Sequence, residues 1–60
     1  MGQKLASFFT KAHQIGGLRA HIRLSVLTKM SWKAASNAPD VPEIIKRFQI
    51  AYKRIESEYK

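Results

Sequence analysis

The sequence predicts an all-α fold: a small bundle of three longer helices plus one short helix. Apolar residues recur every three or four positions, which is the spacing of one face of a helix. No stretch shows the strict alternation of apolar and polar residues that is typical of a strand. Glycines and prolines divide the chain into separate segments. With 60 residues, the chain is expected to form a single small helical domain over residues 1–60.

The first helix is expected over residues 3–14. Its apolar residues share one face, which consists of Leu5, Phe8, Phe9 and Ala12. Gly16 and Gly17 follow, and glycine readily adopts the positive φ angles with which many helices end. We therefore expect this helix to stop near Ile15.

The second helix is expected over residues 18–29 or 18–30, and it is apolar on two sides. Its two stripes consist of Leu18, Ile22, Val26 and Met30, and of Ala20, Leu24 and Leu27. A helix that is apolar on two sides is usually sandwiched between neighbours, so this helix is predicted to lie at the centre of the fold. Arg19 and Arg23 lie between the stripes, where they must extend into solvent or meet an anion.

The last helix is expected to begin at Asp40 and to run to about Glu58. Asp40 and Glu43 have the spacing of a capping box, and Pro42 lies in the first turn, where its missing N–H costs nothing. Its apolar stripe consists of Ile44, Phe48, Ala51, Tyr52, Ile55 and Tyr59. The predicted core of the whole domain consists of Leu5, Phe8, Phe9, Leu18, Ile22, Val26, Leu27, Phe48, Ala51, Tyr52 and Ile55.

The charge of the chain is strongly basic and unevenly distributed. The formal net charge is +7, and all 4 acidic residues lie at or after Asp40. A basic field over the preceding part of the chain attracts phosphates, acidic proteins or anionic lipids. The alternative is that the net charge only keeps a small protein in solution. We favour a polyanionic partner: nucleic acid, DNA in particular, or an acidic protein surface.

Catalytic and metal-binding patterns are absent from the sequence. His13 and His21 are separated by the glycine pair, and no carboxylate lies near them in the chain. Neither a zinc-ligand spacing nor a paired-carboxylate arrangement occurs. We therefore expect no enzyme, no cofactor and no metal. The sequence also has no cysteine, no apolar run long enough for a bilayer and no secretion signal, so a cytoplasmic location is expected.

Residues 24–38 have the pattern of a helix-turn-helix corner. Lys29 and Met30 form the expected turn, and Ser31 is expected to cap a short helix that runs from Trp32 to Asn37 or Ala38. Ala35, one turn after Ser31, is expected to face inward. Four residues of the short helix are expected to face outward: Trp32, Lys33, Ser36 and Asn37.

This corner resembles the helix-turn-helix of the lactose-repressor family of bacterial DNA-binding domains. Met30-Ser31-Trp32 and Ala35-Ser36-Asn37 stand where that family has Val-Ser-Tyr and Val-Ser-Arg runs at the two ends of its recognition helix. Lys29 stands in place of a turn glycine that is common there. The resemblance implies a DNA-binding function, with base-facing Trp32, Lys33 and Asn37 and with Ser36 on the same nucleic-acid-binding surface. Phosphate contacts would come from Arg19, Arg23 and Lys29.

Two other functions use the same residues differently. In the first, the protein is a non-catalytic accessory subunit that docks on a larger complex, or associates with itself, through an exposed apolar patch. Ile45, Ile50 and Tyr59 are the residues that we expect in such a patch. In the second, the first helix lies on a membrane surface, with Phe8 and Phe9 exposed together.

Overall fold

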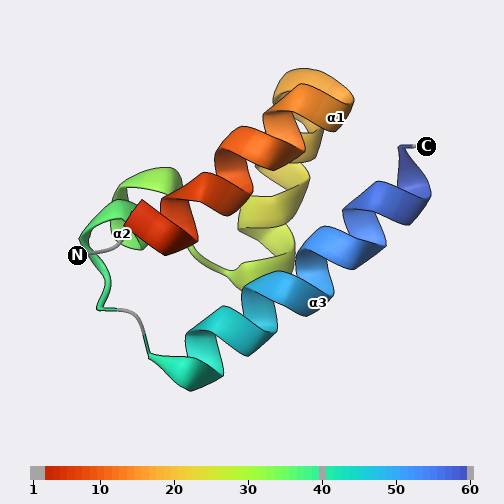
Figure 1. Cartoon of the computed structure of the whole chain (residues 1–60). Coiled ribbons are helices and arrows are strands. Elements are labelled where there is room, and N and C mark those ends of the chain that lie inside the picture. Colours follow the sequence, from red (N-terminus) through yellow and green to blue (C-terminus); the bar gives the residue numbers. More distant parts are fainter. Residues whose placement is uncertain (1–2, 40, 60) are drawn as a thin grey trace.

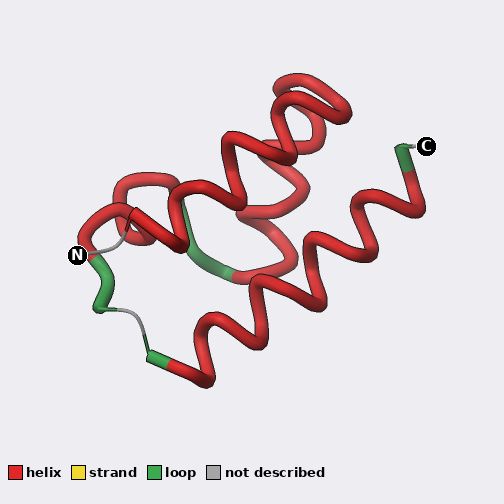
Figure 2. The backbone as a smooth tube through the Cα atoms, in the orientation of Figure 1, coloured by secondary structure: helices red, strands yellow, loops and turns green. Residues whose placement is uncertain are grey.

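The computed structural model describes residues 3–39 and 41–59, and these residues form three helices (Figure 1). They are α1 (Gln3–Thr28), α2 (Trp32–Asn37) and α3 (Pro42–Glu58). The part of the chain that is described contains no strand (Figure 2). The all-α prediction is therefore confirmed.

The long helix α1 is broken at the glycine pair. Gly17 has a φ of 69° and a ψ of −151°, which is not a helical conformation. Figure 1 shows the chain bending sharply there, so that α1 consists of an N-half (residues 3–16) and a C-half (residues 18–28). The predicted stop at the glycine pair is confirmed, although helical hydrogen bonding continues across the bend. The two halves are the first two helices expected from the sequence.

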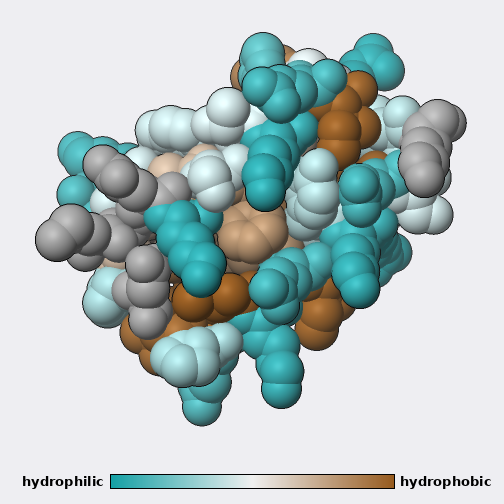
Figure 3. Space-filling view, in the orientation of Figure 1, coloured by the Kyte–Doolittle hydropathy of each residue, from teal (hydrophilic) through white to brown (hydrophobic). Residues whose placement is uncertain are grey.

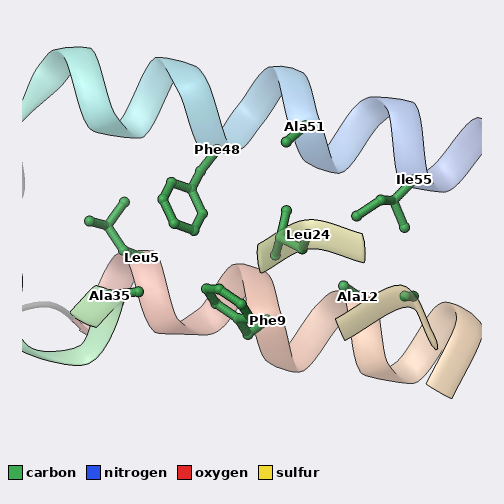
Figure 4. Close-up of a cluster of buried hydrophobic side chains, with 9 residues drawn as sticks. Leu5, Phe9, Ala12, Leu24, Ala35, Phe48, Ala51 and Ile55 are labelled. Carbon is green, nitrogen blue, oxygen red and sulfur yellow. The ribbon is translucent and has the colours of Figure 1, made fainter. Parts of the chain in front are cut away.

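The core lies between the two halves of α1 and α3. In Figure 4 the N-half and α3 run side by side, and Leu24 of the C-half reaches the space between them. The rings of Phe9 and Phe48 meet edge to face, with centroids 5.7 Å apart. The buried residues of the cluster are Leu5, Phe9, Ala12, Ala20, Leu24, Ala35, Phe48, Ala51 and Ile55. Helix α2 contributes Ala35 and packs against α1.

The predicted burial of the first stripe of the C-half is wrong. Leu18, Ile22 and Val26 are 64%, 53% and 59% exposed, respectively. The buried side of the C-half is the second stripe, extended by Thr28, whose hydroxyl donates to the carbonyl oxygen of Leu24 at 2.8 Å. The C-half is not sandwiched, because the N-half and α3 cover it from one side. Three further residues of the predicted core are only partly buried: Phe8, Leu27 and Tyr52.

The start of α3 differs in one respect from the prediction. The helix begins at Pro42, and Val41 occupies the N-cap position without a side-chain hydrogen bond. The expected cap at Asp40 lies outside the described residues. Pro42 does occupy the first turn together with Glu43, as the sequence indicates. The helix ends at Glu58, as expected.

Candidate interaction surface

The most exposed apolar residues of α1 form a single row along its C-half. Leu18, Ile22 and Val26 follow one another at intervals of one turn, so their side chains share one face. We call this row the apolar ridge. It lies on the side of the helix opposite Ala20 and Leu24, which are fully buried. Each ridge residue is more than half exposed, so the row presents three large side chains to solvent.

A basic flank borders the apolar ridge on the side that faces α3. Arg19 and Arg23 lie on this flank, one turn apart. Arg23 reaches across to α3, where its Nε lies 3.4 Å from Oε1 of Glu58. Glu58 is shared with Arg54, whose Nε lies 3.4 Å from Oε2. Within residues 3–39 and 41–59, Arg19 makes no ion pair, so its charge is directed to solvent beside the ridge.

An aromatic cluster borders the apolar ridge on its other side. The rings of His21 and Trp32 stack, with centroids 5.7 Å apart and an interplanar angle of 25°. Phe9 packs against both rings from the core. Its ring centroid lies 5.0 Å from that of His21 and 5.7 Å from that of Trp32. These contacts leave Trp32 42% exposed and hold it against α1.

An open hollow lies in front of this cluster, and we call it the aromatic hollow. Its volume is about 610 Å³. The N-half, the C-half and α2 each contribute to its lining, which consists of Thr10, His13, Gln14, His21 and Trp32. The rings of His13 and His21 are nearly perpendicular, at 86°, with centroids 6.2 Å apart. His21 lines the hollow and also belongs to the aromatic cluster that borders the apolar ridge.

The corner at Ser31 has the local geometry that the sequence predicts. Lys29 adopts a φ of 57°, a left-handed conformation that residues other than glycine adopt at some cost. Ser31 caps α2 by accepting a hydrogen bond from the backbone N–H of Ala34 at 3.1 Å. Ala35 is fully buried, whereas Trp32, Lys33 and Asn37 are exposed. The expected inward side of α2 is therefore confirmed, and so is the outward side except for Ser36, which is half-buried.

The polar side chains of α2 are engaged with their own helix. The hydroxyl of Ser36, which is half-buried, donates to the carbonyl oxygen of Trp32 at 2.9 Å. The amide nitrogen of Asn37 donates to the carbonyl oxygen of Lys33 at 3.0 Å. Of the base-facing residues that the resemblance implies, Asn37 is thus engaged with its own helix, whereas Trp32 packs on His21 and Lys33 is exposed.

The structure does not gather the seven predicted nucleic-acid-binding residues into one patch. Arg19 and Arg23 lie on the basic flank, whereas Trp32 lies on the far side of the apolar ridge. Lys29 lines a smaller hollow of about 310 Å³ together with Arg47 of α3. Figure 3 views the molecule from the side of the N-half and α3. On this side, hydrophilic residues are interleaved with hydrophobic ones. Arg47 was not singled out from the sequence, because its proximity to Lys29 depends on the docking of α3.

Other kinds of site find no support within the described residues. Residues 3–39 and 41–59 contain no group of three metal-ligating side chains placed to hold an ion. None of the helices in this part of the chain is both long and apolar enough to pass through a bilayer. Phe9 is fully buried, so Phe8 and Phe9 are not exposed together as the membrane-surface alternative requires.

Comparison of the chain with protein-family models, with characterised proteins and with solved structures finds no match. The resemblance of residues 24–38 to the lactose-repressor helix-turn-helix therefore stays a prediction from those residues alone.

Sequence reasoning missed the apolar ridge because it placed these residues in the core. One signal favours the exposed assignment: at 100° per residue, Arg19 lies about 20° from Val26 around the helix, whereas it lies about 100° from Ala20 and about 140° from Leu24. A small residue such as Ala20 also allows two helix backbones to approach closely. The aromatic hollow had no signal in the sequence, because its lining comes from three separate segments.

Proposed function

We propose that this protein is a non-catalytic interaction module that docks on an acidic partner protein through the apolar ridge and its basic flank. The observation that carries the proposal is the exposure of Leu18, Ile22 and Val26 in one row. Single exposed apolar residues are ordinary, whereas a contiguous exposed row is typical of interaction surfaces. Full burial of a wholly exposed side chain of this size is worth about 1.5–3 kcal/mol. Each ridge residue is 53–64% exposed, so covering it supplies roughly half to two thirds of that amount.

The charge of the module supports an acidic partner. No carboxylate precedes Asp40 in the sequence, and the formal net charge is +7. Arg19 stands beside the apolar ridge without an ion-pair partner among the residues described. Acidic groups at the rim of a partner would therefore meet complementary charge, which accelerates encounter and sets orientation.

Nucleic-acid binding is a second candidate function, and the corner at Ser31 favours it. The left-handed turn at Lys29, the cap at Ser31 and the buried Ala35 have the arrangement of a helix-turn-helix. The apolar ridge has no role in this function, because phosphates bind cations and hydrogen-bond donors. The intrahelical hydrogen bonds of Ser36 and Asn37 also compete with contacts to bases. We therefore rank it below protein docking.

The proposal is tested by selecting binders from a random peptide display library on the immobilised protein. We expect the selected peptides to combine apolar residues at helical spacing with acidic residues. Ile22→Asp is expected to weaken their binding about tenfold or more, because it places a charge in the centre of the ridge. Ile50→Asp is the matched control, because Ile50 is 66% exposed but lies on α3.

Two outcomes would contradict the docking proposal. One is a set of selected peptides that bind wild type and Ile22→Asp equally well. The other is saturable quenching of Trp32 fluorescence by duplex DNA, with a steep salt dependence that Lys33→Ala reduces and Ile22→Asp leaves unchanged. The second result would make nucleic-acid binding the function of the corner at Ser31.

A further inference from the structure

We propose that the aromatic hollow is the anchor pocket of the docking surface, and that it receives an aromatic side chain from an acidic amphipathic helix lying along the apolar ridge. This inference rests on the proposed function and specifies the partner. The aromatic side chain would project from the edge of the partner helix, beside the apolar residues that cover the ridge. The ridge then supplies apolar contact area with the partner helix, and the hollow supplies selectivity for an aromatic side chain.

The hollow and the ridge form one continuous surface. His21 lines the hollow and lies three residues after Leu18, so the two side chains are neighbours on the surface of α1. Trp32 stacks on His21 and extends the surface onto α2. A helix that covers Leu18 and Ile22 therefore passes directly beside the hollow.

The walls of the hollow suit an aromatic ring that carries a polar atom. Trp32, His21 and His13 present ring faces and edges at different angles, and aromatic rings pair favourably in offset or edge-to-face arrangements. Thr10 and Gln14 are exposed at the same hollow and add a hydroxyl and an amide. A tyrosine, which has a ring and a terminal hydroxyl, can use both kinds of wall.

The pocket is formed before any partner binds. Phe9, which is fully buried, contacts the rings of both His21 and Trp32 and keeps them in place. These two walls of the open hollow require little ordering on binding, so more of their contact free energy contributes to affinity. Anchors of this kind, a large aromatic side chain in a preformed pocket, dominate the affinity of many interfaces.

A second copy of this chain is a poor occupant of the same surface. In an antiparallel two-fold pairing of ridges, equivalent flanks meet, so the arginine flank of one copy would lie against the arginine flank of the other. In a parallel two-fold pairing, the arginine flank would instead meet the side of the helix with His21 and Ser25. The side of the helix with His21 and Ser25 brings no acid to offset this repulsion. An acidic helix from another protein instead places carboxylates opposite Arg19, which is the reason for assigning the surface to a different chain.

The test uses synthetic helical peptides with apolar residues at intervals of one turn, glutamates on both flanks, and one tyrosine. The tyrosine is moved in turn through the positions beside the apolar row, and alanine replaces it in the reference peptide. Binding to the 60-residue chain is measured by titration calorimetry and by Trp32 fluorescence. We expect one tyrosine position to raise the affinity about tenfold over the reference peptide and to shift the Trp32 emission.

A variant whose hollow is blocked by an added side chain then tests whether the tyrosine binds there. Gln14→Phe places a ring in the hollow from an exposed helix position, and Gln49→Phe adds the same ring at an exposed position of α3 as a control. We expect Gln14→Phe to remove the gain from tyrosine, measured as the ratio of the affinities of this variant for the tyrosine peptide and the reference peptide. Gln49→Phe should preserve the gain. The control measurement is circular dichroism, in which both variants should have the helical spectrum of the wild-type protein.

The outcomes separate the two proposals. If the reference and tyrosine peptides both fail to bind the folded wild-type protein, the proposed docking function is overturned, and this inference with it. If the reference peptide binds but no tyrosine position improves it, or the gain survives in Gln14→Phe, only the anchor pocket is overturned. Sedimentation that shows a dimer disrupted by Ile22→Asp would overturn the assignment of the surface to a different chain.

Discussion

The ring of Tyr59 lies directly against Gly16, so closely that a Cβ atom on Gly16 would be 2.6 Å from Cδ1 of the ring. Tyr59 follows the last residue of α3, and Gly16 immediately precedes the bend in α1. The contact therefore seats the end of α3 on the bend. Nearby, Arg23 and Glu58 join the same two elements at the surface, which reinforces the position of α3.

Gly16→Ala is expected to destabilise the fold by about 1–3 kcal/mol, because the new methyl group overlaps Tyr59 and the Cβ of Ala20. Urea unfolding followed by circular dichroism measures the free energy of unfolding. Repeating the measurement in a Tyr59→Ala background should reduce the cost, because the ring is then absent. An undiminished cost in that background would show that the contact with Tyr59 is not its source.

Gly17→Ala is expected to cost about 1–3 kcal/mol for a different reason. Gly17 adopts a φ of 69° with a ψ of −151°, a backbone conformation that is strongly disfavoured for residues with a Cβ atom. An added Cβ would nevertheless have no other atom within 4 Å. The strain lies in the backbone, so Tyr59→Ala should leave the loss of unfolding free energy unchanged. A Gly17→Ala variant as stable as wild type would show that the bend adopts another conformation in solution.

The exposed and buried sides of the C-half of α1 predict opposite responses to truncation. Leu24→Ala is expected to cost about 2–5 kcal/mol, because Leu24 is fully buried between the N-half and α3. Ile22→Ala is expected to change the free energy of unfolding by less than about 0.5 kcal/mol, because its side chain is 53% exposed. Equal losses in the two variants would mean that the ridge is covered in solution.

Ser31→Ala is expected to lower the free energy of unfolding by about 1 kcal/mol, because the N–H of Ala34 loses its acceptor. Since α2 carries Trp32, the loss should also appear as a change in Trp32 fluorescence before global unfolding. Ser57→Ala is a suitable control, because Ser57 is an exposed residue within α3. A Ser31→Ala variant with the stability and emission of wild type would contradict the assigned cap.

The sequence by itself located the breaks between the helices, although α3 begins at Pro42 and not at the expected Asp40. Glycine at Gly17, the hydroxyl of Ser31 and the ring of Pro42 each act on the backbone within a few residues, so their effects are visible without knowledge of the fold. The inward position of Ala35 follows from the same local geometry, because Ser31 sets the start of α2.

Only the tertiary structure decided which side of the C-half of α1 is buried. The stripe of Leu18, Ile22 and Val26 and the stripe of Ala20 and Leu24 both satisfy helical periodicity, and periodicity alone does not rank them. The bend at Gly17 and the seating of α3 turn Leu24 inward and leave the ridge in solvent. The aromatic hollow arises in the same way, because side chains from three segments converge on it only after the chain has folded back at Gly17.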